Sequence, residues 1–196
     1  MDSRHPVGGA FIESRPRFLF VLLSLSASLS GCDAFAPPRP AEGTSRPTWR
    51  VCFSPNGGCT QLIIDTLAGA TTSVSVQAYS FTSTPIATAL IKAHQRGVAV
   101  SVLLDKSQRT EHDTLGWYLA QAGVPVRIDA AHSIAHNKVM IIDGETVITG
   151  SFNFTRAAEV HNAENLLVLR DRALAARYQA NWDAHAAHAD PFESRR

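Results

Sequence analysis

Residues 135–153 read AHNKVMIIDGETVITGSFN, and this stretch predicts a β-hairpin. Two apolar runs flank the dipeptide Asp143-Gly144, which favours a two-residue type I′ turn. A turn of this length also sets the register of the two strands. The expected cross-strand pairs are Ile142 with Glu145, Met140 with Val147, Lys138 with Thr149, and His136 with Ser151.

Polar side chains gather on one face of this expected hairpin. Because side chains alternate along a strand, His136 and Lys138 share a face with Thr149, Ser151 and Asn153. An imidazole, an ammonium, hydroxyls and an amide suit a phosphate diester, with Lys138 and Asn153 on its oxygens. The neighbouring strand residues are apolar, so a charged lysine among them favours a functional role over a structural one.

The segments around the hairpin alternate between strand and helix patterns. Strands are expected at 73–79, 98–104, 124–128 and 165–169, and helices at 61–68, 85–96, 111–122 and 171–185. This alternation predicts an α/β fold with a mixed, largely parallel central sheet and helices on both faces.

The N-terminal residues have the features of a secretory leader. Basic residues precede the apolar run Phe18–Leu29, and the ending Leu29-Ser30-Gly31-Cys32 resembles a bacterial lipobox with a diacylated Cys32. The alternatives are an ordinary signal peptide cut elsewhere and a short buried helix. We expect residues 1–31 to be the leader, 32–48 a Pro-rich tether, and 49–196 the catalytic domain. The protein would then be extracytoplasmic and lipid-anchored to the bacterial cell membrane, facing the periplasm in a Gram-negative cell.

The charge balance excludes a polycationic nucleic-acid binder. The formal net charge of the 196 residues is +1, and without the leader basic and acidic residues are equal in number. Any binding of nucleic acid must therefore use a local basic site.

Cys52 and Cys59 flank a turn that contains Pro55 and a Gly-Gly pair. Outside the cytoplasm such a pair favours a disulfide over two free thiols, and a zinc site would need a second cysteine pair. The spacing of His132 and His136 does not indicate a metal pair. The remaining histidines His161, His185 and His188 are expected at the solvated surface.

The pattern His136-x-Lys138-x4-Asp143, followed by Gly150-Ser151-x-Asn153, resembles the HKD signature of the phospholipase D superfamily. The resemblance extends from Trp49 to Trp182 and is strongest to the short, single-motif bacterial endonucleases of that superfamily. It implies a phospholipase D/nuclease-like fold.

The resemblance also implies a role for each matching residue. His136 corresponds to a nucleophile that forms a phosphohistidine, and Lys138 and Asn153 correspond to phosphate ligands. Ser151 would support the site, and Glu164 would bond the far nitrogen of the histidine. Asp143 completes the motif, but it lies at the turn, on the other face. We expect it to be chiefly structural, with a catalytic contribution left open.

The expected activity is hydrolysis of phosphodiester bonds, foremost as a non-specific endonuclease on DNA or RNA. The alternatives are a phospholipase D that hydrolyses phosphatidylcholine-type lipids and a catalytically silent module that binds nucleic acid or lipid. No cofactor or metal is expected in the reaction, because histidine, lysine and asparagine supply the nucleophile and the charge. One chain carries one motif, whereas the reaction also needs an acid for the leaving group. We therefore expect a homodimer with its active site at the two-fold interface.

Overall fold

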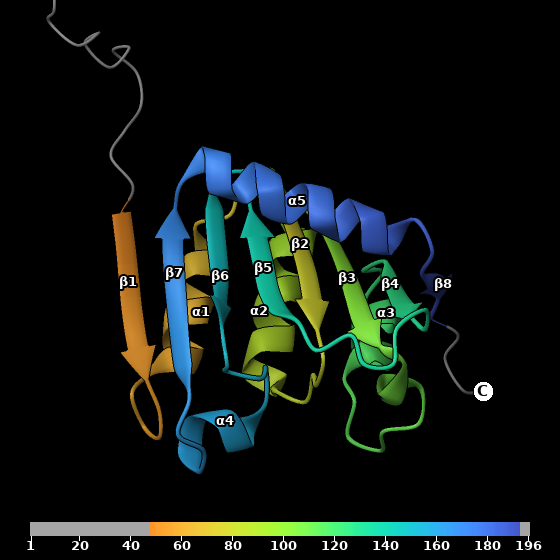
Figure 1. Ribbon diagram of the computed structural model, residues 1–196, viewed down its shortest axis with the longest axis horizontal. Helices are drawn as coiled ribbons and strands as arrows, with labels where there is room; N and C mark the ends of the chain where they lie inside the picture. Colours follow the sequence, from red (N-terminus) through yellow and green to blue (C-terminus); the bar gives the residue numbers. More distant parts are fainter. Residues whose placement is uncertain (1–47, 193–196) are drawn as a thin grey trace, which may run out of the picture. The chain divides into compact units, whose positions relative to one another are not determined.

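Eight strands form a single open sheet in the computed structural model, which describes residues 48–192 (Figure 1). In sheet order they are β1 (Thr48–Phe53), β7 (Asn165–Arg170), β6 (Thr146–Gly150), β5 (Lys138–Ile142), β2 (Ser73–Ala78), β3 (Ala99–Asp105), β4 (Val126–Asp129) and β8 (Asp190–Pro191). The mixed α/β class is confirmed, but the sheet is not largely parallel. Among the eight named strands of residues 48–192, only β2–β3 and β3–β4 pair in parallel, because the chain enters and leaves β5 and β6 through reversals that pair antiparallel.

Helices cover both faces of the sheet, as expected (Figure 1). One apolar core lies beneath α1 (Cys59–Ala68), α2 (Thr84–Gln95) and α3 (Gly116–Gln121). A second, smaller core lies beneath α5 (Arg172–Ala186), where the indole nitrogen of Trp182 donates to the carbonyl of Val76 at 2.9 Å. The short helix α4 (Arg156–Val160) and the 3₁₀ turn η1 (Lys106–Arg109) lie at strand ends.

All five residues of strand β5 are buried. Met140 and Ile142 contribute to the core beneath α1 and α2, whereas Val139 and Ile141 contribute to the core beneath α5. This explains the nearly unbroken apolar run in the sequence, because a strand covered on both faces has no solvent side. The strand begins with a buried charged side chain, Lys138.

The predicted turn forms at the tip of the hairpin, but the predicted register is wrong by one residue. Asp143 and Gly144 both have positive φ, 54° and 64°, and the Glu145 N–H donates to the Ile142 carbonyl at 3.1 Å. The ladder nevertheless pairs Ile142 with Thr146 and Met140 with Ile148. Glu145 is the additional residue, and contacts with the end of β7 and the N-cap of α5 hold it out of the ladder. Its carbonyl accepts from the Asp171 N–H at 2.8 Å, and its carboxylate pairs with Arg170 at 2.7 Å.

The helix expected over 111–122 forms only at Gly116–Gln121. The N–H of Leu115 donates to the carbonyl of Phe81 at 3.0 Å and so is not available to Glu111. Gly116 then packs so closely on the sheet that a Cβ would lie 2.8 Å from Leu104 Cδ1. Tertiary contacts therefore override the helical spacing in this segment.

The disulfide predicted between Cys52 and Cys59 is present, with the two Cα atoms 5.6 Å apart. It ties strand β1 to the first residue of α1. The predicted leader, the lipidated Cys32 and nearly all of the tether lie outside the described residues. Between residues 48 and 192 no helix is long and apolar enough to cross a membrane.

The carboxylate of Asp143 clamps the hairpin tip to the segment that leads into β2. It accepts hydrogen bonds from the backbone N–H groups of Thr71, Thr72 and Ser73 and from both threonine hydroxyls, at 2.8–3.2 Å. These bonds hold the pKa of Asp143 far below its ordinary value, although burial opposes them as the largest single effect. These bonds give Asp143 a structural role at the hairpin tip.

The substitution Asp143→Asn is expected to cost about 1–2 kcal/mol of stability at pH 7, because an amide cannot accept all of these bonds and partial exposure screens the charge. The folded pKa lies below the ordinary value near 3.8, so the contribution is complete above that pH and is lost as the pH falls below it. Urea unfolding at pH 7 and at pH 3 measures both effects. Equal midpoints for wild type and variant at pH 7 would contradict the clamp.

Candidate active site

The predicted residues His136 and Lys138 lie where β5 begins. Lys138 pairs with Ala78 of β2, and the next residue, Tyr79, places its ring 4.6 Å from the imidazole of His136. The ammonium of Lys138 lies 5.0 Å from the centre of the same ring and donates a 2.7 Å hydrogen bond to the His136 carbonyl. The imidazole is exposed, whereas Lys138 is only 7% exposed. An exposed nucleophile candidate thus stands beside a buried cation.

Burial lowers the pKa of Lys138, and the carboxylate of Glu164 acts against this shift. The opposing charge shows that Glu164, just before β7, is near enough to Lys138 to interact with it. Lys138 and Glu164, which are 26 positions apart in the sequence, thus lie close enough for their charges to interact. A partly desolvated ammonium attracts an incoming anion more strongly than a hydrated one, because less water screens it.

The segment after β6 turns sharply at Gly150. Its φ is 144°, and a Cβ there would lie 2.3 Å from the carbonyl oxygen of Asn165, so only glycine fits. That carbonyl accepts from the N–H groups of both Ser151 and Phe152, at 3.1 and 3.2 Å, which interrupts the strand alternation. Placing Thr149 on the Lys138 face is therefore wrong, because the observed register sets it on the other face. For Ser151 and Asn153 the alternation ends at the Gly150 turn, so it no longer predicts their positions.

Beyond this turn, Ser151 and Asn153 differ in how their polar atoms are used. The Ser151 hydroxyl accepts from the backbone and side-chain N–H groups of Asn165, at 3.1 and 3.2 Å. The side-chain oxygen of Asn153 is buried and has no partner among the described residues. A buried amide oxygen without a partner costs about 1–3 kcal/mol, so Asn153 is a group still open to a ligand or a second chain.

Glu164 is anchored through its backbone to Ser54, whose N–H donates to the Glu164 carbonyl and whose hydroxyl accepts from the Glu164 N–H. Its carboxylate accepts a 3.0 Å hydrogen bond from Asn162. Between residues 48 and 192 no hydrogen bond joins Glu164 to the His136 ring, in contrast to the expected orienting contact. Glu164 is half-buried; its carboxylate is held by Asn162 and acts on Lys138 through its charge.

Asp143 lies away from this cluster. It follows the last residue of β5, whereas Lys138 is the first, and five residues of strand span about 16 Å. Its carboxylate already accepts bonds from Thr71, Thr72 and Ser73. The motif therefore places its histidine and lysine at one end of a strand and its aspartate at the other.

No local sequence pattern predicts that Tyr79 contacts His136 and Lys138. The alternation of 73–79 places it at the end of a strand, as core or as a wall of the site. Its contact with His136 and Lys138 arises from the pairing of β2 with β5, which are separated by some sixty residues in the chain.

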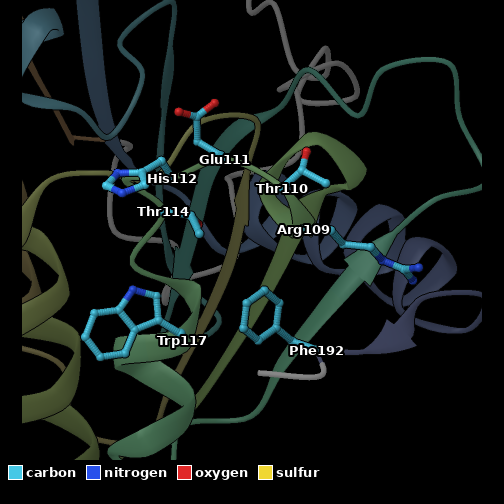
Figure 2. A pocket seen from close by; sticks show the side chains of 7 residues that line it. All are labelled: Arg109, Thr110, Glu111, His112, Thr114, Trp117 and Phe192. Carbon is cyan, nitrogen blue, oxygen red and sulfur yellow. The ribbon is translucent and has the colours of Figure 1, made fainter. Parts of the chain in front are cut away.

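A hollow of about 310 Å³ lies elsewhere, in the loop between β3 and α3 (Figure 2). None of the motif residues lines it. Its lining residues are Arg109, Thr110, Glu111, His112, Thr114, Trp117 and Phe192. The guanidinium of Arg109 points away from the hollow in Figure 2 and pairs with Asp190 at 2.6 Å, so the hollow lacks an uncommitted cation of the kind a phosphate would need.

The other histidines divide into two groups. His161 is exposed, as expected. His132, His185 and His188 instead gather around the buried Asp129, and the side chain of His185 is only 16% exposed. Their expected place on the solvated surface is therefore wrong for His185, because α5 packs its last turn against the end of β4.

The start of β5, the end of β6 and the start of β7 lie side by side at one end of the strands (Figure 1). In that order they carry an imidazole with a buried ammonium, a hydroxyl with an amide, and a carboxylate. Residues 63–186 match the family model described as "Cardiolipin synthase, PLD-like domain". The chain belongs to the phospholipase D superfamily. The expected phospholipase D-like fold is thereby confirmed.

Similar proteins cover most of the chain. It is 42% identical over 174 residues to a protein of Rickettsia prowazekii named phospholipase D, covering 89% of this chain and 84% of the relative. It is 34% identical over 125 residues to the mitochondrial cardiolipin hydrolase of Xenopus laevis, covering 64% of this chain and 60% of the relative. The crystal structure of Nuc from Salmonella typhimurium, a phospholipase D family member, matches with a TM-score of 0.73 at 37% identity, covering 76% of this chain and all of that one.

The substitution Lys138→Met is expected to separate stability from activity in this phospholipase D-like chain. Removing the desolvated charge should raise the stability at pH 7 by about 0.5–2 kcal/mol, whereas loss of the cation should lower turnover at least 100-fold. Because the folded pKa of Lys138 is lowered, the wild type should regain stability relative to the variant as the pH rises toward 10.5.

Thermal unfolding and turnover of Lys138→Met should be compared with those of Lys92→Met, a matched change at an exposed position of α2. The control should shift stability by less than about 0.5 kcal/mol and keep its activity. A Lys138→Met protein that kept wild-type turnover would show that the buried ammonium does not act on the substrate.

Proposed function

We propose that the chain is an endonuclease that cleaves DNA or RNA with little sequence preference through a phosphohistidine at His136. Membership of the superfamily makes it a phosphodiesterase. The observation that carries the mechanism is the exposed imidazole of His136 beside the buried ammonium of Lys138, on the end of a fully buried strand. A nucleophile and a positive charge at that spacing suit attack on an anionic phosphate diester.

In the first step a ring nitrogen of His136 attacks phosphorus, so a P–N bond forms as the P–O bond to the leaving group breaks. A second histidine protonates the leaving oxygen. In the second step that histidine takes a proton from water, and the water oxygen replaces His136 on phosphorus. Lys138 and Asn153 bind the nonbridging oxygens in both steps, and Ser151 holds the turn that carries Asn153.

In this mechanism Glu164 is a positioning residue. Its backbone is fixed by Ser54, and its carboxylate lies near Lys138. Rotation of that carboxylate toward His136 would fix the tautomer of the imidazole and stabilise its protonated form. Metal-generated hydroxide is not required, because the imidazole is itself the nucleophile and the lysine supplies the charge.

Two substrate classes compete. Nucleic acid is favoured because the motif pattern resembles the short, single-motif bacterial endonucleases of the superfamily. The short family member Nuc also matches along its whole length, at 37% identity. Phospholipid is the second candidate, because the Rickettsia relative is named phospholipase D, the Xenopus relative is named cardiolipin hydrolase, and a lipid anchor would hold the enzyme at a membrane. The even charge balance of the chain does not separate the two, since either substrate presents one phosphate diester to the same site.

The purified full-length protein should be incubated in parallel with plasmid, single-stranded DNA, RNA, phosphatidylcholine vesicles and cardiolipin vesicles. The nucleic acids should be cleaved and the lipids should not. His136→Asn should reduce cleavage at least 1000-fold because an amide cannot attack phosphorus, whereas His161→Asn, a change at an exposed histidine near the site in sequence, should cleave normally. Cleavage of lipid alone would establish the second candidate, and a tenth of the wild-type rate in His136→Asn would exclude this nucleophile.

We propose further that two chains form one active site. The described chain has a single histidine-lysine pair of this kind, so the leaving-group acid would be His136 of a second copy. Three large apolar side chains on strand β1 are exposed in the single chain: Trp49 at 67%, Phe53 at 65% and Val51 at 42%. They alternate along the strand and so share one face, and Phe53 pairs with Asn165 beside Glu164. The strip ends at Phe53, whose strand partner Asn165 adjoins Glu164, and a second copy would cover it.

Polar substitutions on the strip should therefore dissociate the enzyme and inactivate it together. Trp49→Ser combined with Phe53→Ser should sediment as a monomer at micromolar concentration and lose at least 100-fold in turnover. Trp117→Ser, at another exposed aromatic residue, should remain a fully active dimer. Full activity in a demonstrably monomeric double variant would contradict a shared site.

The extracytoplasmic, lipid-anchored location remains part of the proposal. Its support is the leader pattern, the lipobox-like ending at Cys32, and the Cys52–Cys59 disulfide, a bond typical of proteins in oxidising compartments. An anchored nuclease on a Pro-rich tether would act on nucleic acid that reaches the cell surface or the periplasm.

A further inference from the structure

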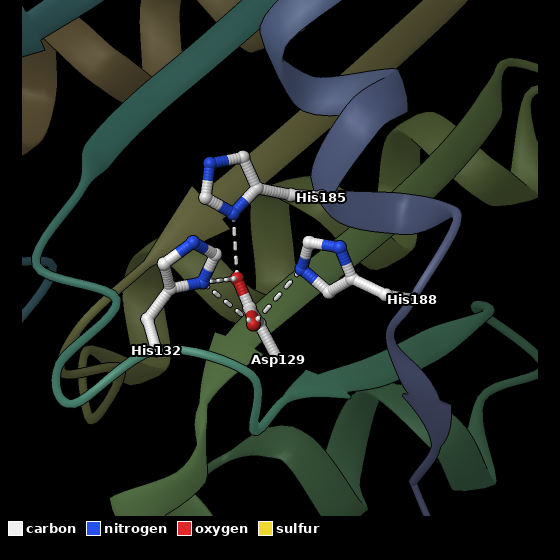
Figure 3. A group of neighbouring side chains, drawn as sticks. All are labelled: Asp129, His132, His185 and His188. Atoms are coloured by element: carbon white, nitrogen blue, oxygen red, sulfur yellow. Dashed lines mark hydrogen bonds and ion pairs between the residues drawn. The ribbon is translucent and has the colours of Figure 1, made fainter.

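Four side chains converge at the end of strand β4 (Figure 3). Asp129 is the last residue of β4 and is fully buried, and His132 lies in the loop that follows it. His185 comes from the last turn of α5, and His188 follows that helix. One ligand atom from each residue lies within 4.8 Å of those from the other three.

The three imidazoles all aim a nitrogen at the same carboxylate, as Figure 3 shows. His185 Nδ1 lies 2.6 Å from Asp129 Oδ2, His132 Nδ1 lies 3.1 Å from Oδ1, and His188 Nε2 lies 3.2 Å from Oδ1. The ring centroids of the three histidines are 4.7–5.5 Å apart. Three rings are thus arranged around one point rather than spread over the surface.

We propose that Asp129, His132, His185 and His188 bind one zinc ion. Zinc takes three or four nitrogen and oxygen ligands at about 2.0–2.2 Å in tetrahedral geometry, which sets neighbouring ligand atoms about 3.3 Å apart. The distances from the carboxylate to His132 and His188, 3.1 and 3.2 Å, are close to this value, whereas His185 at 2.6 Å would have to move outward. Two ligands come from the end of β4 and its loop, spaced Asp-x2-His, and two from the end of α5, spaced His-x2-His, with 52 residues between the two pairs.

A hydrogen-bonded cluster without metal is the competing explanation. A carboxylate can accept several N–H groups, and Asp129 also accepts from the backbone of Ala131 at 3.2 Å. Such a cluster needs three imidazoles with their protonated nitrogens turned inward. A zinc ion needs the opposite, three unprotonated nitrogens that face one point, and so the two explanations differ in metal affinity.

The ion would have a structural role. Four protein ligands fill a tetrahedral site, and none of them belongs to the group of His136, Lys138 and Asn153. Asp129 and His132 lie in the segment that runs directly to His136, whereas His185 and His188 lie where α5 gives way to β8. Zinc would therefore fasten the loop that leads to the nucleophile onto the C-terminal helix, closing a long stretch of chain.

The test uses the full-length protein without a histidine tag, stripped with a chelator, dialysed and titrated with zinc chloride. One equivalent should bind per chain and raise the unfolding temperature. Cobalt in place of zinc should give the visible absorption of a tetrahedral site. His188→Ala and His132→Ala should each bind zinc at least 100-fold more weakly, whereas His112→Ala, at an exposed histidine outside the cluster, should bind as the wild type does.

The same titration of His136→Asn separates this inference from the proposed reaction. That variant should be inactive and still bind one zinc ion with unchanged affinity and unchanged stabilisation. Failure of the wild type to bind a stoichiometric ion would overturn the proposal, and so would equal affinity in His188→Ala and His112→Ala. Loss of the ion in His136→Asn would also overturn it, because the ligand would then be the catalytic histidine.

Discussion

The antiparallel pairing of β5 with β2 is the contact on which the other features depend. It joins the parallel strands β2, β3 and β4 to the antiparallel strands β6, β7 and β1 in one sheet. At one end it sets Lys138 beside Ala78 and Tyr79 beside His136, and at the other end Asp143 holds the segment before β2. A slip of one residue would turn Lys138 to the other face of the sheet, away from the site, so the register fixes the chemistry as well as the core.

The site contains two polar groups whose burial costs free energy in the single chain. The ammonium of Lys138 is buried at the start of an apolar strand, which lowers its pKa, and the amide oxygen of Asn153 has no partner between residues 48 and 192. Both costs are understandable if an anionic substrate and a second chain complete the site. The exposed apolar strip of Trp49, Val51 and Phe53 also fits a second chain, because one chain alone leaves it in contact with water.

Local patterns were sufficient for much of the fold. The apolar run of β5, the Asp143-Gly144 turn, the helix at the C-terminal end and the cysteine pair each predict what the structure contains, because each depends on neighbours in the sequence. The predictions that fail depend on distant contacts. Glu145 leaves the hairpin ladder because of Asp171 and Arg170, and Leu115 leaves the expected helix because of Phe81.

The candidate site divides in the same way. The spacing of His136, Lys138 and Asn153 marks them in the sequence, but the contact of Tyr79 with both motif residues follows only from the sheet order. The cluster around Asp129 joins residues more than fifty positions apart, and no spacing within either segment identifies it. The packing of α5 against β4 is what brings the Asp129 carboxylate to His185 and His188.

The central claim, a covalent phosphohistidine at His136, is tested most directly by the stereochemistry at phosphorus. A phosphorothioate diester of known configuration would be cleaved in heavy-oxygen water and the configuration of the product determined. Two successive in-line displacements, first by His136 and then by water, each invert phosphorus and so give net retention. Retention is the result that the account predicts, and inversion, the signature of a single direct attack by water, would contradict it.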